Sequence, residues 1–208
     1  MTELSIRVAT EADLAVLVRL QSDTVRWLAA QGLDQWQPTG RSERQTPERM
    51  QQRIEDAVGR GECYVAVDGF RIAAMAIVDE LADPEFWHEE DEPRDALYVH
   101  RVIVDRGYAG SGLGEALVDF ASKLAADRGK SWLRLDAWRT NLALHGYYRR
   151  QGFDHVRTVS LPHRGSGVLF QRRAGEASRG TVRFERMERM GPEGEELRQG
   201  GSPDGEGR

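Results

Sequence analysis

The sequence predicts a mixed α/β (α+β) fold, in which helices flank a sheet of several strands. Stretches in which apolar and polar residues alternate, as in strands, are interspersed with stretches of helical periodicity, and glycine or proline residues separate them. The chain has 208 residues, of which 39% are hydrophobic and 30% are charged, enough for one domain with a sizeable core. We expect this domain at residues 4–173, followed by a disordered tail at 174–208, where charged residues and glycine dominate.

The first elements expected are a strand and two helices. Residues 5–8 alternate as in a short strand, and Thr10 then opens an apolar-periodic helix that extends towards Trp27. Thr46 is an N-cap candidate because proline follows it at the first helical position, and this second helix should end near Gly59.

A hairpin and a longer strand are expected next. Residues 63–67 and 72–78 form two strands around an Asp-Gly turn, since that pair tolerates the positive φ of a tight reversal. Residues 83–95, which are acidic and aromatic, connect the hairpin as a loop to a strand at 96–104.

The C-terminal half alternates between helix and strand. Its clearest helix begins at Leu113, carries apolar residues at helical spacing and stops at Gly129. The remaining elements are a strand at 133–138, a helix at 141–151, and strands at 153–161 and 167–173.

Composition limits the functional classes. The formal net charge of −5 disfavours nucleic acid as a partner. The longest nearly uninterrupted apolar stretch, residues 72–78, is far shorter than the ~20 residues of a membrane-spanning helix, and the first residues lack the features of a secretory signal. The single cysteine, Cys63, cannot form an internal disulfide and is expected to be an inert core thiol. We therefore expect a cytoplasmic protein without a membrane or nucleic-acid partner.

A glycine-rich turn joins the strand at 96–104 to the clearest helix. Glycine lets backbone N–H groups converge on an anion, and the positive end of the helix dipole adds to the attraction, so a pyrophosphate is the natural ligand. A dinucleotide-binding fingerprint would require its third glycine at Glu115, which makes a nucleotide-dependent oxidoreductase the weaker interpretation. The residues expected to form the anion site are Ala109, Gly110, Ser111, Gly112, Leu113 and Gly114.

Two blocks of sequence resemble the GNAT acyltransferase family. The turn resembles its acetyl-CoA-binding motif, Arg/Gln-x-x-Gly-x-Gly/Ala, in which Gly112 and Gly114 take the two small positions and Ala109 stands where the family usually has arginine or glutamine. The second block runs from residues 133–136 through an asparagine-containing helix to the pattern Tyr-x-x-x-Gly-Phe at residues 148–153. Both blocks occur in the family's order and separation, and with the flanking elements the similarity covers nearly the whole expected domain.

The resemblance implies a mixed, mostly antiparallel sheet that splays open after the fourth strand, with coenzyme A in the V-shaped gap. It implies direct transfer of an acetyl group from acetyl-CoA to a primary amine of a small-molecule or peptide acceptor, which the sequence does not identify. A non-catalytic acyl-CoA-binding regulatory module is the alternative. Asn141 would contact the cofactor's arm, or would cap its helix, and both interpretations stay open. The backbone groups implied to hold the pantetheine arm are those of Val102, Ile103 and Val104.

Two side chains are candidates for proton transfer. The resemblance places the family's general acid at Tyr148, whereas neighbouring Tyr147 better suits core packing. A phenol has a pKa of ~10 and a thiol one of ~8.5, so complete transfer to a free thiolate is uphill by roughly 2 kcal/mol, and the proton should move as the C–S bond breaks. Some members of the family carry a glutamate base where Tyr98 stands here. His100 shares a face with Tyr98 and is the candidate base, because imidazole titrates near neutral pH; a hydrogen-bonded structural histidine is the other interpretation.

The resemblance implies an acceptor pocket at the first helices and the loops around the splayed strands, where this chain has four aromatic residues. With nearby acids these would suit a cationic or amphipathic amine, or they would simply fill the core. The scattered histidines predict no metal site. Apolar residues in the tail would pack on the domain or on a second copy of the chain, which keeps a homodimer open, unless they are solvated. The aromatic residues are Trp27, Trp36, Phe86 and Trp87, and the tail residues are Val182, Phe184, Met187 and Met190.

Overall fold

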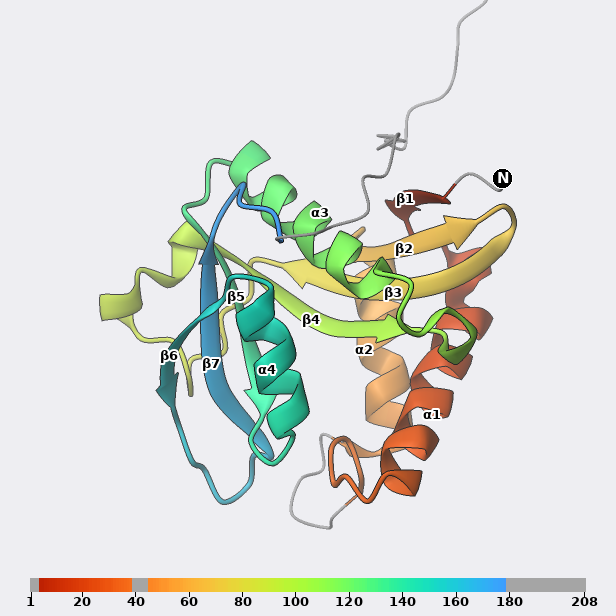
Figure 1. Cartoon of the computed structure of the whole chain (residues 1–208), viewed down its shortest axis with the longest axis horizontal. Coiled ribbons are helices and arrows are strands. Elements are labelled where there is room, and N and C mark those ends of the chain that lie inside the picture. The colour runs from red at the N-terminus through yellow and green to blue at the C-terminus, as the bar shows by residue number, and fades with distance from the viewer. Residues whose placement is uncertain (1–3, 39–44, 179–208) are drawn as a thin grey trace, which may run out of the picture.

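A seven-stranded sheet forms the centre of the fold (Figure 1), and the computed structural model describes residues 4–38 and 45–178. The strands lie in the order β1-β2-β3-β4-β5-β7-β6, and every neighbouring pair is antiparallel except β4 and β5. The expected mixed, mostly antiparallel sheet is therefore confirmed. The strands are β1 (Leu4–Val8), β2 (Cys63–Asp68), β3 (Arg71–Asp79), β4 (Ala96–Val104), β5 (Trp132–Trp138), β6 (Asp154–Thr158) and β7 (Ser166–Arg173).

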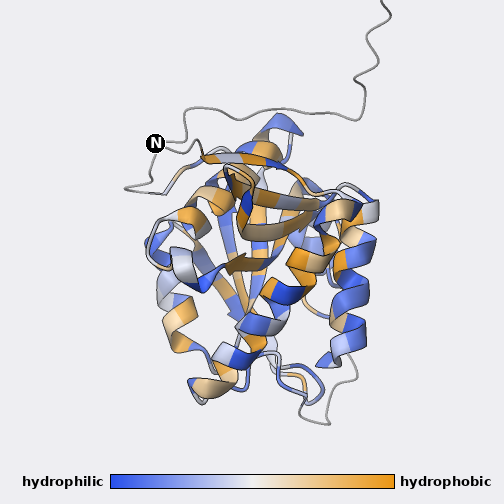
Figure 2. Ribbon diagram, turned by 90° about the vertical axis from the view of Figure 1, so that its right-hand side faces the viewer, coloured by the Kyte–Doolittle hydropathy of each residue, from blue (hydrophilic) through white to orange (hydrophobic). Residues whose placement is uncertain are grey.

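Four α-helices flank the sheet, two on each face (Figure 1). Apolar residues of α3 and α4 bury one face of the sheet, and those of α1 and α2 bury the other. Figure 2 shows hydrophobic and hydrophilic residues in alternation along the helices, the pattern expected when one side of a helix packs on a sheet. The helices are α1 (Leu14–Ala30), α2 (Pro47–Gly59), α3 (Leu113–Asp127) and α4 (Leu142–Arg150).

Local capping interactions explain where the first two helices begin. The Asp13 carboxylate accepts hydrogen bonds from the backbone N–H and the hydroxyl of Thr10, at 2.8 and 3.1 Å. At α2, the Thr46 hydroxyl accepts a hydrogen bond of 3.3 Å from the Arg49 N–H, and proline occupies the first helical position. The start of α2 agrees with the sequence-based prediction, whereas Thr10 opens a short 3-10 turn, Glu11–Asp13, that leads into α1 at Leu14.

The sheet opens between β4 and β5. These two parallel strands pair only at their first residues, from Ala96 opposite Trp132 to Tyr98 opposite Arg134. Beyond Tyr98, β4 continues beside β3 while β5 continues beside β7. The expected splay after the fourth strand is thus present, and it leaves one edge of β4 without a strand partner.

A β-bulge distorts β4 at the opening. His100 lies opposite Ile77, whereas Ile103 lies opposite Met75, so two residues of β4 share the space of one residue of β3. Arg101, inside the bulge, has a φ of 49°, a left-handed conformation that is uncommon for a side chain other than glycine, asparagine or aspartate. The bulge re-aims the side chains of β4 just where the sheet splits.

The sixth strand is shorter than predicted. Strand pairing of β6 ends at Thr158, although the N–H of Val159 still donates to the carbonyl of Gly167 at 2.8 Å. Gly167 has a φ of 138°, and a proline follows Leu161, so the chain turns away from the ladder instead of continuing to residue 161.

The described chain continues past the expected end of the domain. The N–H groups of Ala174 and Gly175 donate to the carbonyls of Ser131 and Ser122, both at 2.9 Å, and Ser178 bonds to the Asp119 carboxylate. The boundary at 173 and the tail thus stay predictions, and the apolar tail residues at 182–190 lie outside the described residues. Within residues 4–38 and 45–178, no helix is long and apolar enough to cross a membrane.

Candidate active site

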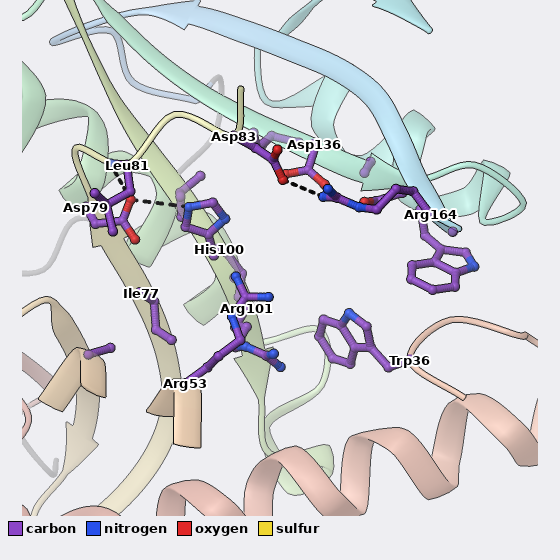
Figure 3. A pocket seen from close by; sticks show the side chains of 18 of the residues that line it. Trp36, Arg53, Ile77, Asp79, Leu81, Asp83, His100, Arg101, Asp136 and Arg164 are labelled. Carbon is purple, nitrogen blue, oxygen red and sulfur yellow. Dashed lines mark hydrogen bonds and ion pairs between the residues drawn. The ribbon is translucent and has the colours of Figure 1, made fainter. Parts of the chain in front are cut away.

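The opening between β4 and β5 leads into a cavity of about 550 Å³, which we call the central cavity. Its walls include residues 99–102 of β4 and 135–138 of β5, with Tyr148 of α4 on one side and α2 on the other. The segment after α1 covers one end of the cavity and is held there by Asp34, which accepts a hydrogen bond of 2.9 Å from the indole N–H of Trp138. Figure 3 shows the side chains that point into this space. A cavity of this size holds a small molecule or part of a cofactor.

The N-terminus of α3 lacks a side-chain cap. Gly112 is the N-cap residue, with a φ of 82°, and offers no side chain to the first turn, whereas α2 and α4 are capped by Thr46 and Asn141. The first N–H groups of any α-helix have no acceptor inside the helix. Gly110, two residues earlier, also has a left-handed backbone, with a φ of 78°. Backbone donors therefore converge here with the positive end of the helix dipole, which suits a phosphate group.

Two of the six expected anion-binding residues use their N–H groups elsewhere. The N–H of Ala109 donates to the Arg106 carbonyl at 3.3 Å, and that of Ser111 donates to the Tyr108 carbonyl at 3.1 Å. The Ser111 hydroxyl also donates to the Tyr108 carbonyl, at 2.6 Å. The amide donors without an acceptor among the described residues are those of Gly110, Gly112, Leu113 and Gly114.

Gly114 lies where α3, α4 and the end of β4 meet. A Cβ atom at this position would be 2.6 Å from the Tyr147 hydroxyl oxygen and 3.4 Å from a methyl group of Val104. Only glycine fits without displacement of these neighbours. The uncapped helix end thus adjoins the unpaired edge of β4, where some backbone N–H and C=O groups of residues 102–104 face the opening.

Tyr148 is buried at the wall of the central cavity. Its ring lies 5.4, 5.6 and 6.1 Å from the rings of Tyr147, Phe153 and Phe170, and only 7% of the residue is exposed. Burial raises the pKa of Tyr148 above the ordinary value of a phenol. Because its pKa is raised, the Tyr148 hydroxyl stays protonated at neutral pH. This hydroxyl makes no hydrogen bond to a described residue, so its proton is not already donated there. Tyr147, by contrast, reaches over Gly114, and burial raises its pKa to about 12.

His100 faces the same cavity and contacts an aspartate. Its Nε2 atom lies 3.4 Å from a carboxylate oxygen of Asp79, which also accepts a hydrogen bond of 2.9 Å from the Leu81 N–H (Figure 3). Tyr98 lies on the same face of β4 but is sealed from the cavity, because Trp87 packs against its ring and its hydroxyl donates to a backbone carbonyl. Of the two positions, His100 alone lines the cavity.

Asn141 acts as the helix cap that the sequence allowed. Its side-chain oxygen accepts a hydrogen bond of 3.1 Å from the Leu144 N–H, and its amide nitrogen donates to the side chain of Gln35 at 2.7 Å. Both polar ends of Asn141 are thus engaged with protein partners.

The four aromatic residues expected near an acceptor occupy different environments. Trp36 lines the central cavity, whereas Phe86 and Trp87 are buried in a core cluster under β7 and β4. Trp27 lies beneath the guanidinium of Arg106, at 4.0 Å from its ring centre. Most of these rings therefore pack against other side chains, which was the alternative interpretation of the sequence.

Several polar residues of the site were missed by the sequence analysis. Asp79, Asp136 and Arg101 line the cavity, and Arg164 does so while paired with Asp83. Asp79, Arg101 and Asp136 lie on three different strands, and nothing in the sequence showed that their side chains meet around one space.

Two further expectations concern cysteine and metals. Cys63 is fully buried in the core between the sheet and the helices α1 and α2, and burial raises its pKa to about 12, as expected for an inert thiol. Among residues 4–38 and 45–178, no three His, Cys, Asp or Glu side chains are grouped as a metal site.

Comparison with known proteins gives one consistent result. The sequence pattern of the acetyltransferase (GNAT) family matches residues 26–153. The chain is 30% identical over 153 residues, 70% of its length and 77% of the relative's, to the uncharacterized N-acetyltransferase YesJ of Bacillus subtilis. A GNAT-family acetyltransferase from Listeria monocytogenes has a solved structure with a TM-score of 0.64 and 26% identity, over 81% of this chain and 93% of that one.

A third similar protein was crystallised with ligands. The structure of the aminoglycoside acetyltransferase AAC(6')-Ib in complex with coenzyme A and kanamycin has a TM-score of 0.58 and 23% identity, over 82% of this chain and 95% of that one. At this identity the likeness concerns the fold.

Proposed function

The chain belongs to the acetyltransferase (GNAT) family and is an N-acetyltransferase, and we propose that it moves an acetyl group directly from acetyl-CoA to a primary amine of a small molecule or peptide. One observation carries the proposal. The uncapped, glycine-flanked N-terminus of α3 adjoins the unpaired edge of β4, and that edge leads into the cavity that Tyr148 lines. The anion site at α3, the unpaired edge of β4 and the proposed proton donor, Tyr148, thus lie in succession along one path into the cavity.

The residues present fit coenzyme A. We propose that the free N–H groups of Gly110 and of residues 112–114 bind its diphosphate, and that the backbone of residues 102–104 bonds to the amide groups of its pantetheine arm. Ala109 and Ser111 would shape the turn, since their N–H groups are already used. Asn141 would contact the arm only by giving up its hydrogen bond to Gln35.

Acetyl-CoA supplies an activated acetyl thioester, and we propose that Tyr148 protonates the departing sulfur. A free thiolate with a pKa of ~8.5 is a weaker base than a phenolate with one of ~10, so transfer to it is uphill by about 2 kcal/mol. Because burial raises the pKa of Tyr148 further, a separate proton-transfer step would cost more than this. Tyr148 would therefore release its proton as the C–S bond breaks and negative charge grows on sulfur.

The acceptor must lose a proton before or during attack. An alkyl amine with a pKa of ~10.4 is neutral in less than about one part in a thousand at pH 7. We propose that His100 removes this proton, directly or through a water molecule, and that Asp79 orients the imidazole. Both residues line the same cavity as Tyr148, which supports a mechanism in which base and acid act in one space.

Cysteine content and net charge bear on where the protein works and on what it modifies. A single, buried cysteine gives the domain no need of an oxidising compartment, and we propose that the protein works in the cytoplasm. The acceptor proposed here is not a nucleic acid, because the net charge is negative.

Two measurements test this function. Calorimetry should detect acetyl-CoA binding to the folded chain, and a thiol-release assay over a panel of amines should show release that depends on the amine and yields acetylated product. Binding without release by any amine would favour the alternative, a non-catalytic acyl-CoA-binding module. A folded protein that does not bind acetyl-CoA would contradict both.

A further inference from the structure

Arg101 is a largely buried cation in the central cavity. It stands in the β-bulge of β4, and its guanidinium points into the space between β4 and the segment after α1 (Figure 3). One N–H group donates to the side-chain oxygen of Gln21 at 2.5 Å, and the guanidinium lies 5.7 Å from the centre of the Trp36 ring. The backbone at Arg101 is left-handed, which costs on the order of 1–3 kcal/mol for a residue of this kind.

No carboxylate of the described residues pairs with Arg101. Two other arginines of the cavity wall differ in this respect, since Arg164 contacts Asp83 and Arg60 contacts Glu62 at 2.7 Å. The charged side chain that acts on the Arg101 guanidinium is a second cation, Arg53, which also forms no ion pair with a described residue. Burial and this like charge lower the pKa of Arg101 to about 9. A buried charge without a counter-ion is costly, and a site that keeps one offers it to a ligand.

Resting on the proposed function, we propose that the acceptor is an amine that also carries a carboxylate, as amino acids and their derivatives do, and that Arg101 binds this carboxylate. A guanidinium has five N–H donors, of which one is used here by Gln21. No described residue accepts a hydrogen bond from the remaining donors, and a planar fork of this kind matches the two oxygens of a carboxylate. Gln21 and Trp36 would hold the guanidinium plane in position.

The position of Arg101 fits a small acceptor. His100, the proposed base, is the preceding residue of β4, and residues 102–104 follow with the proposed pantetheine edge. On the opposite wall, Asp136 of β5 makes no hydrogen bond or ion pair with a described residue, although it lies close enough to Arg164 for the two charges to attract each other. The cavity therefore presents a cation without a counter-ion on one wall and a carboxylate on the other, a pattern complementary to a molecule with both an ammonium and a carboxylate group.

The same charges argue against a polycation. Kanamycin, the ligand in the structure of AAC(6')-Ib, carries several amines and no carboxylate. Arg53 and Arg101 would repel such a molecule at the α2 side of the cavity. We expect aminoglycosides to be poor acceptors.

Calorimetry with matched ligand pairs tests the proposal without relying on turnover. The probes are the common amino acids and short dipeptides, each compared with its C-terminal carboxamide, which keeps the amine and loses the carboxylate. We expect at least one acid to bind the wild-type protein on the order of 10- to 100-fold tighter than its amide. Arg101→Gln should abolish that difference, and Arg101→Lys should retain part of it.

Two controls make the result specific. Arg60→Gln removes a cavity arginine that already has a partner and should leave the preference for the acid intact. Arg101→Gln should change the melting temperature little, because removal of a buried charge offsets loss of the hydrogen bond to Gln21, and it should still bind acetyl-CoA normally. A folded wild-type protein that does not bind acetyl-CoA would count against the proposed function. Absence of an acid preference in every pair, with acetyl-CoA binding intact, would overturn the present proposal.

Discussion

Replacement of Tyr148 by phenylalanine removes one oxygen from the centre of the proposed mechanism. The ring would keep its contacts with Phe153 and Phe170, and no described residue loses a hydrogen bond. We therefore expect the free energy of unfolding to change by less than about 1 kcal/mol, because neither a cavity nor an unsatisfied buried group is created.

Turnover should respond quite differently. General acid catalysis contributes ~10²–10⁴-fold to a rate, so Tyr148→Phe should lower kcat by about 100-fold or more, or ~2.7 kcal/mol in activation free energy. Affinity for acetyl-CoA should stay within about threefold, since the proposed diphosphate and pantetheine contacts are backbone groups of other segments.

Tyr147→Phe is the matched control for this experiment. It makes the same chemical change one residue away, on a ring whose hydroxyl lies over Gly114 and not at the cavity wall. Steady-state thiol release and calorimetry should show kcat within about threefold of wild type for Tyr147→Phe. Equal kcat values for Tyr148→Phe and the wild type would refute the role of Tyr148 as the acid.

Three other predictions concern the cofactor site, the base and stability. Gly114→Ala should weaken acetyl-CoA binding by about tenfold, because the new Cβ atom would lie 2.6 Å from the Tyr147 hydroxyl oxygen. The double variant with Tyr147→Phe, which lacks that oxygen, should recover most of the affinity. Normal binding of acetyl-CoA by the single variant in calorimetry would contradict this prediction. His100→Gln should remove the low-pH limb of the kcat/KM profile, and Asp79→Asn should alter it in part, whereas an unchanged profile would exclude His100 as the base. The Arg157 guanidinium lowers the pKa of Asp91 to about 2, below its unfolded value of ~3.9, so its stabilising contribution is present above about pH 4 and is lost as the pH falls towards 2. Asp91→Asn should accordingly lower the melting temperature at pH 7 and make little difference near pH 2, and equal shifts at both pH values would contradict the ion pair's role.

The elements that the sequence predicted best are those set by local interactions. The helix α2 begins after Thr46 and ends at Gly59, as expected, because a cap and a proline act within one turn. The strand β4 has the predicted bounds, 96–104, and the glycine turn leads into α3 as predicted. In each case the residues that determine where the element begins or ends lie next to that point in the sequence.

The features that the sequence could not predict arise from contacts between distant segments. The contact of His100 with Asp79 depends on the register of β3 against β4, which local patterns do not encode. The exposure of Arg101 to the cavity depends on a bulge that shifts this register by one residue. Phe86 was expected at the acceptor site because the family resemblance puts that site at the loops around the splayed strands, but pairing of strands far along the chain buries it beneath β7.

The most direct test of the proposed cofactor site compares coenzyme A with pantetheine by amide chemical shifts. At matched saturation, coenzyme A should shift the backbone amide resonances of Gly110, Gly112 and Gly114 strongly, because its diphosphate would accept their free N–H groups. Pantetheine, which lacks the diphosphate, should perturb residues 102–104 and leave these glycines nearly unmoved. Saturation by coenzyme A without movement of the three glycine resonances would contradict the diphosphate site at the start of α3.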